Sequence, residues 1–82
     1  MIKVLFFAQL REQLNCDQVE VECPSPSNPS WLREQLVEAN PHWKEFLANE
    51  KLLFSVNQTI VKASHVVKDG DEVAFFPPVT GG

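Results

Sequence analysis

The sequence has little of several features that would indicate catalysis, metal binding or contact with nucleic acid. Its two cysteines, Cys16 and Cys23, form no C-x-x-C motif and no ligand-spaced pairing with His42 or His65. Lysine and arginine total seven against eleven aspartates and glutamates, without a basic cluster, so a nucleic-acid partner is not expected. No apolar run approaches the roughly 20 residues of a membrane helix, so we expect no membrane partner either.

Catalytic motifs are also lacking. The sequence shows no Ser-His-Asp set, no glycine-rich phosphate loop and no metal cluster. Asp69 and Asp71 flank a glycine, and carboxylates in such a turn are far more often solvated than catalytic. We therefore expect a chain that is not catalytic alone and holds no cofactor or metal.

The composition fits one small domain. The apolar fraction of 44% over 82 residues is normal for a globular protein and too high for disorder. The segment Met1–Ala8 contains Lys3 and is followed by Arg11 and Glu12, so it resembles a strand more than a signal peptide. We expect reduced, structural cysteines and a cytoplasmic location.

Alternating apolar residues predict strands along the chain. At the start of the chain, the alternation predicts Ile2, Val4 and Phe6 in the core and Leu5 and Phe7 on the opposite sheet face. The same pattern predicts further core positions at Val19, Val21, Cys23, Leu52, Phe54, Val56, Val73 and Phe75. The remaining residues of these strands are expected to face outward. A hairpin is expected at Asn57-Gln58, leading to a short strand at Thr59–Val61.

Helical spacing predicts three helical segments. Leu10 and Leu14 indicate a short helix that ends near Asn15. Asn28-Pro29 is typical of a helix start, and Pro41 is expected to end that main helix. The apolar face of the main helix is expected to include Trp31, Leu32, Leu36, Val37 and Ala39. Trp43, Phe46 and Leu47 suggest one or two further turns, with their side chains in the core.

The order of these elements predicts an α+β fold. Strand, short helix, strand, main helix and three strands fit a β-grasp, or ubiquitin-like, arrangement. In it, a mixed four- to five-stranded sheet packs on one main helix, with short extra helices. We expect residues 1–76 to form this domain and residues 77–82 to form an extended tail.

The tail ends in Val79-Thr80-Gly81-Gly82 after the rigid pair Pro77-Pro78. Glycine has no Cβ, so such an end can enter a narrow channel. The carboxylate of Gly82 is therefore the candidate reactive group. It is a poor electrophile until it is activated, for example as an acyl phosphate formed from ATP. The chain shows no nucleotide site, so a separate enzyme has to activate it.

A docking face is expected beside the tail. Leu5, Phe7 and Phe76 fall on the sheet face opposite the main helix, and the register of the hairpin decides whether Ile60 joins them. A cluster of large exposed apolar residues marks a protein-binding surface, unless other elements cover it. Arg11 is expected to add a polar contact at its rim.

Three segments resemble one known family. The opening MIKVLFFA, the turn Val56–Thr59 and the ending DGDEVAFFPPVTGG are similar to the small, sulfur-carrier subunits of molybdopterin synthase, which are ubiquitin-like sulfur carriers. The similarity spans the whole chain length and is most specific at the ending. The segment Pro24–Lys51 adds little to it.

The resemblance implies a sulfur-transfer cycle in molybdenum cofactor biosynthesis. An E1-like adenylating enzyme uses ATP to adenylate Gly82, and a persulfide donor converts it to a thiocarboxylate. The tail then enters the large synthase subunit and gives its sulfur to cyclic pyranopterin monophosphate. This makes the chain the sulfur-donating subunit of a heteromeric sulfurtransferase. Gly81 is the required neighbour, and the partner contacts are expected from Phe7, Arg11, Ile60, Phe76, Pro77, Pro78, Val79 and Thr80.

Three other functions remain open from the residues. A carrier for thiamine synthesis or tRNA thiolation would share the fold and the Gly-Gly end, although the Phe-Phe-Pro-Pro-Val stalk favours the molybdopterin pathway. A ubiquitin-like modifier would be joined to lysines of other proteins. An adaptor domain would have an inert tail, and deletion of Gly82 would leave its activity intact.

Overall fold

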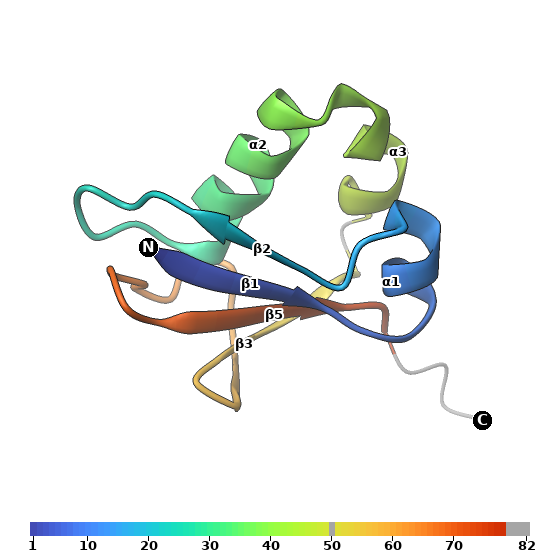
Figure 1. Ribbon diagram of the computed structural model, residues 1–82. Coiled ribbons are helices and arrows are strands. Elements are labelled where there is room, and N and C mark those ends of the chain that lie inside the picture. Colours follow the sequence, from blue (N-terminus) through green and yellow to red (C-terminus); the bar gives the residue numbers. More distant parts are fainter. Residues whose placement is uncertain (50, 79–82) are drawn as a thin grey trace.

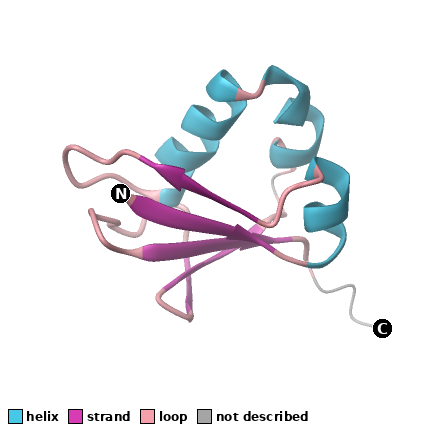
Figure 2. Cartoon of the chain, viewed as in Figure 1, coloured by secondary structure: helices cyan, strands magenta, loops and turns pink. Residues whose placement is uncertain are grey.

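The structure is a computed structural model that describes residues 1–49 and 51–78. Within these residues, five strands and three α-helices follow one another (Figures 1 and 2). Their bounds are β1 (Ile2–Phe6), α1 (Ala8–Leu14), β2 (Gln18–Val21), α2 (Pro29–Ala39), a 3-10 turn (Pro41–Trp43), α3 (Lys44–Leu47), β3 (Leu53–Val56), β4 (Thr59–Val61) and β5 (Glu72–Phe76).

The strands form one mixed sheet in the order β2-β1-β5-β3-β4. The first and last strands, β1 and β5, pair in parallel at its centre, and the other neighbours are antiparallel. Helices α2 and α3 lie on one side of this sheet, and α1 lies at the end where β1 finishes (Figure 1). This is the predicted β-grasp arrangement, with five strands.

The core lies between the sheet and the helices. The predicted inward residues of β1 and β5 are nearly inaccessible, with Ile2, Val4, Val73 and Phe75 at 0% exposure. Phe75 packs edge-on against Phe54, with ring centroids 5.1 Å apart, and more distantly against Phe6. Edge-to-face aromatic pairs stabilise a core beyond the area that they bury.

Local chemistry explains where the main helix begins. The Asn28 side chain accepts a hydrogen bond from the backbone N–H of Trp31 at 2.8 Å, and Pro29 is the first helical residue. Leu32 and Leu36 are buried as predicted. The prediction for Ala39 was wrong, because this residue ends the helix just before Asn40-Pro41 and is exposed.

Left-handed residues make the sharp turns. Asn15 ends α1 with φ 53°, as predicted, and the hairpin residues Asn57 and Gln58 have φ 50° and 73°. Two successive residues with positive φ match the turn type that fits the twist of a β-hairpin. Strand β2 ends at Val21, two residues earlier than the alternation suggested, although Cys23 is still buried.

Candidate docking face and tail exit

The sheet face turned away from α2 and α3 carries an apolar patch. Paired residues of neighbouring strands point to the same face, so the register can be followed across the sheet. One row runs from Leu5 on β1 through Ala74 on β5 and Ser55 on β3 to Ile60 on β4. This register places Ile60 on the same face as Leu5.

A second row of the patch lies closer to the tail. Leu53 on β3 pairs with Phe76 on β5, and Phe7 follows the end of β1. The Phe7 backbone N–H donates to the carbonyl oxygen of Phe75 at 3.3 Å, so the chain after β1 stays beside the end of β5. We call Leu5, Phe7, Leu53, Ile60, Ala74 and Phe76 the outer patch.

Exposure differs within the outer patch. Ile60 is 65% exposed and Phe7 is 46% exposed, whereas Leu5, Leu53 and Phe76 are half-buried. Ala74 faces outward as predicted but is only 6% exposed, because its short side chain lies on the middle strand of the sheet between Leu5 of β1 and Ser55 of β3. Large apolar side chains left open to water on one face are typical of a protein-binding surface.

Leu53 is the residue that the sequence prediction missed. Leu52 and Leu53 are both apolar, and only the pairing of β3 with β5 shows that Leu53 lies beside Phe76 on the outer face. The signal available in the sequence was the alternation, in which Leu53 lies between Leu52 and Phe54 and so points to the opposite sheet face.

Arg11 lies at the same end of the sheet as Phe7. Phe7 precedes the first residue of α1, and the Arg11 backbone N–H donates to the Phe7 carbonyl oxygen at 3.4 Å. The Arg11 side chain is exposed. The structure therefore places these two predicted contact residues one helical turn apart, near the point where the tail begins.

The tail begins directly after the patch. Pro77 and Pro78 follow Phe76 and are half-buried. The predicted reactive residues Gly81 and Gly82, and the predicted contact residues Val79 and Thr80, lie outside the described residues. The part of the chain that is described therefore fixes the starting point of the tail at the edge of the outer patch.

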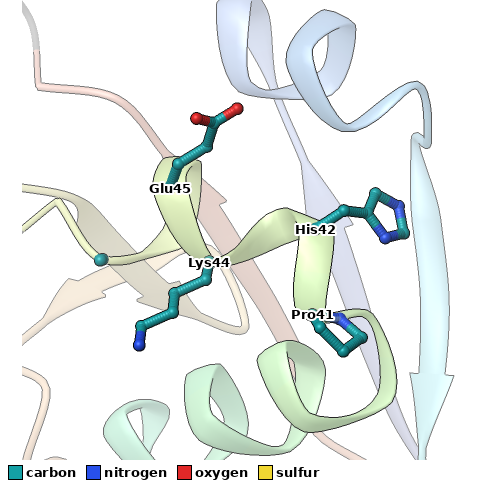
Figure 3. Close-up of a pocket in the computed structure, with 5 residues that line it drawn as sticks. Pro41, His42, Lys44 and Glu45 are labelled. Carbon is teal, nitrogen blue, oxygen red and sulfur yellow. The ribbon is translucent and has the colours of Figure 1, made fainter.

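Elsewhere the described residues show no converging catalytic groups. A depression is lined by Pro41, His42, Lys44, Glu45 and Ala48, but the three ionisable side chains point away from one another (Figure 3). Within residues 1–49 and 51–78, no three His, Cys, Asp or Glu side chains are grouped to hold a metal ion. Cys16 and Cys23 are free thiols.

The two aspartates of the predicted turn have structural contacts. Asp71 accepts hydrogen bonds from the Lys68 backbone N–H at 2.9 Å and from the Asn57 side chain at 3.2 Å. Asp69 pairs with the ammonium group of Met1, and this hydrogen bond raises the pKa of the ammonium above its usual value. Both carboxylates thus form contacts that stabilise the turn leading into β5.

No helix among the described residues is long and apolar enough to cross a membrane.

Comparison with known proteins identifies the family. Residues 4–82 match the model of the ThiS family. The chain is 51% identical over 82 residues to the molybdopterin synthase sulfur carrier subunit of Escherichia coli strain K12, and the alignment covers 100% of both chains.

Solved structures share the fold. The crystal structure of SAMP1 from Haloferax volcanii aligns with a TM-score of 0.82 at 24% identity, covering 99% of this chain and 98% of that one. A protein-protein complex of subunits 1 and 2 of molybdopterin-converting factor from Helicobacter pylori contains a chain that aligns with a TM-score of 0.65 at 23% identity, covering 99% and 97%. At these identities the similarity shows the fold alone.

Proposed function

Because this chain belongs to the ThiS family, we propose that it is the sulfur-carrier subunit of a molybdopterin synthase and acts in molybdenum cofactor biosynthesis. The observation that carries the proposal is the 51% identity, over the full length of both chains, to a sulfur carrier subunit of that synthase. The outer patch adds a physical reason, because it lies where the tail leaves the domain.

The reactive position in this proposal is the carboxylate of Gly82. An E1-like adenylating enzyme uses ATP to form the acyl-adenylate, which replaces a poor leaving group by AMP. A persulfide donor then attacks the acyl-adenylate, AMP leaves, and a thiol cleaves the resulting acyl disulfide to release the thiocarboxylate together with a disulfide of the donor. This group is anionic at neutral pH and its sulfur is polarizable, so it needs no further deprotonation to act as a nucleophile. Gly81 lets the backbone beside it pass through a narrow channel.

The partner in sulfur transfer is the large synthase subunit. It would receive the tail, hold cyclic pyranopterin monophosphate and supply the catalytic groups. The outer patch, with Arg11 at its rim and the segment from Pro77 to Thr80, would form the contact. The carrier itself binds no cofactor, is not catalytic alone and works in the cytoplasm, where its two thiols stay reduced.

Intact-mass measurement tests the proposal. The carrier is incubated with ATP, its adenylating enzyme and a sulfur source, and a mass increase equal to the difference between sulfur and oxygen is expected. The matched control is the chain without Gly82, which should stay unchanged. Isopeptide-linked conjugates in cells, with no thiocarboxylate species, would instead favour a protein modifier and would contradict the proposal.

A further inference from the structure

The outer sheet face carries a row of alternating charge in addition to the outer patch. The register places Glu20 of β2 beside Lys3 of β1, and Lys3 beside Glu72 of β5. Neighbouring strands are about 4.8 Å apart, so negative, positive and negative groups follow one another at one-strand intervals. Glu20 and Lys3 are exposed and Glu72 is half-buried. We call these three residues the charged row.

None of the three side chains forms an ion pair within the described part of the fold, although the charge of Glu20 helps the Asp69 hydrogen bond to raise the pKa of the Met1 ammonium. Among residues 1–49 and 51–78, no nitrogen–oxygen pair within 4.0 Å joins Lys3 to either glutamate, and the ion pair found there is the one between Met1 and Asp69. The backbone of Glu72 is held on both sides by Asn57, which accepts from its N–H at 3.1 Å and donates to its carbonyl oxygen at 2.8 Å. The strand position of this glutamate is therefore fixed, although its carboxylate has no hydrogen-bond donor among the described residues.

Apolar contact alone leaves the orientation of a docked carrier open. Hydrophobic attraction is non-directional, so the outer patch can hold a partner without fixing rotation about the patch. The tail, however, has to enter a channel from one direction. The charged row lies four residues from Phe76 along β5, or about 13 Å at strand spacing. A second contact at that distance prevents rotation about the patch.

We propose that the charged row orients the carrier on the large synthase subunit, which presents a basic side chain opposite Glu20 and Glu72 and a carboxylate opposite Lys3. This inference rests on the proposed function. Alternation makes the match specific, because a displacement by one strand places like charges opposite one another. The row acts by positioning and takes no part in the chemistry.

Inversion of the row provides the test. The triple variant Glu20→Lys, Lys3→Glu, Glu72→Lys keeps the alternation and shifts the net charge from −4 to −2. The variant Glu38→Lys, on the exposed side of α2, produces the same net charge without touching the sheet. Thermal unfolding checks that both fold. Binding to the large subunit and the sulfur-transfer rate of thiocarboxylated carrier at saturation are then compared.

The triple variant is expected to bind about tenfold more weakly than Glu38→Lys and to transfer sulfur more slowly at saturation. If its unfolding shows that it does not fold, the isosteric pair Glu20→Gln and Glu72→Gln replaces it, with about threefold weaker binding and a reduced dependence on salt expected. Binding and transfer equal to those of Glu38→Lys would overturn the inference.

A parallel measurement on Phe76→Ala separates this inference from the docking-face assignment, and sulfur transfer by the unchanged carrier tests the proposed function itself. If Phe76→Ala weakens binding and the inverted row does not, the charged row has no orienting role and the outer patch remains the docking face. If neither variant changes binding, the docking face itself is wrong.

Discussion

Adjacent phenylalanines on β5 should give opposite results when each is replaced by alanine. Phe75 is 0% exposed and packs edge-on against Phe54 and Phe6, with ring centroids 5.1 and 6.1 Å apart. Phe76 is half-buried on the other face, in the outer patch. The two variants therefore remove the same atoms from a core site and from a docking site in neighbouring positions.

The magnitudes follow from that difference. Truncation of a fully buried phenylalanine costs about 3–5 kcal/mol of unfolding free energy, which is a large share of the ~5–15 kcal/mol available to a small domain. At roughly 4–8 °C per kcal/mol, Phe75→Ala should lower Tm by at least 12 °C. Phe76→Ala leaves the core packing unchanged, so we expect it to cost about 1 kcal/mol of stability.

Binding should show the reverse order among folded variants. Loss of an interface anchor at Phe76 should cost about 1–3 kcal/mol of binding free energy, and so raise Kd for the large subunit by about 5- to 150-fold. Thermal unfolding followed by circular dichroism measures Tm, and calorimetric titration with the large subunit measures Kd. A Tm loss for Phe76→Ala as large as that for Phe75→Ala, or an unchanged Kd, would refute the assignment of the two faces.

Other predictions concern the tail, the caps and pH. Deletion of Gly82 should abolish sulfur acceptance, seen by intact mass, and leave Tm unchanged, since β5 ends six residues earlier; a sharp fall in Tm would contradict this. Gln58→Gly should stabilise the hairpin by about 0.5–1 kcal/mol in urea unfolding, because its φ of 73° suits glycine. Asn28→Ala should cost about 1 kcal/mol by removing the α2 cap, and Asn28→Asp should restore most of it. The pKa of the Met1 ammonium is raised by its pairing with Asp69, so this pairing stabilises the fold below about pH 8. The small contribution disappears as pH rises through the folded-state pKa of the ammonium. If the unfolding free energy of Asp69→Asn depended on pH as that of the unchanged chain does, this contribution would be excluded.

Periodicity predicted much of the fold because most of its signals are local. Alternation placed Ile2 and Val4 in the core, and Asn28-Pro29 located the start of α2. These features depend on side-chain direction and capping, which neighbouring residues determine.

The errors concern pairing between distant segments and the ends of elements. Alternation turned Leu53 away from Leu52 and Phe54, but its place beside Phe76 depends on the pairing of β3 with β5, because strand register is a tertiary property. Ala39 fitted the helical spacing but lies at the last position of α2, where the core no longer covers it. The reactive positions Gly81 and Gly82 stay predictions, supported by the family and by the starting point of the tail.

The central pairing of β1 with β5 has a consequence for how this carrier is made. The innermost neighbour of the first strand is the last strand, separated from it by nearly the whole chain. A nascent chain that stops before β5 lacks Val73 and Phe75 and leaves Ile2 and Val4 uncovered at the sheet centre. Such a chain cannot close its core and is open to proteolysis. The domain can therefore fold only after β5 has been synthesised, and β5 is the segment that joins the domain to its sulfur-accepting end.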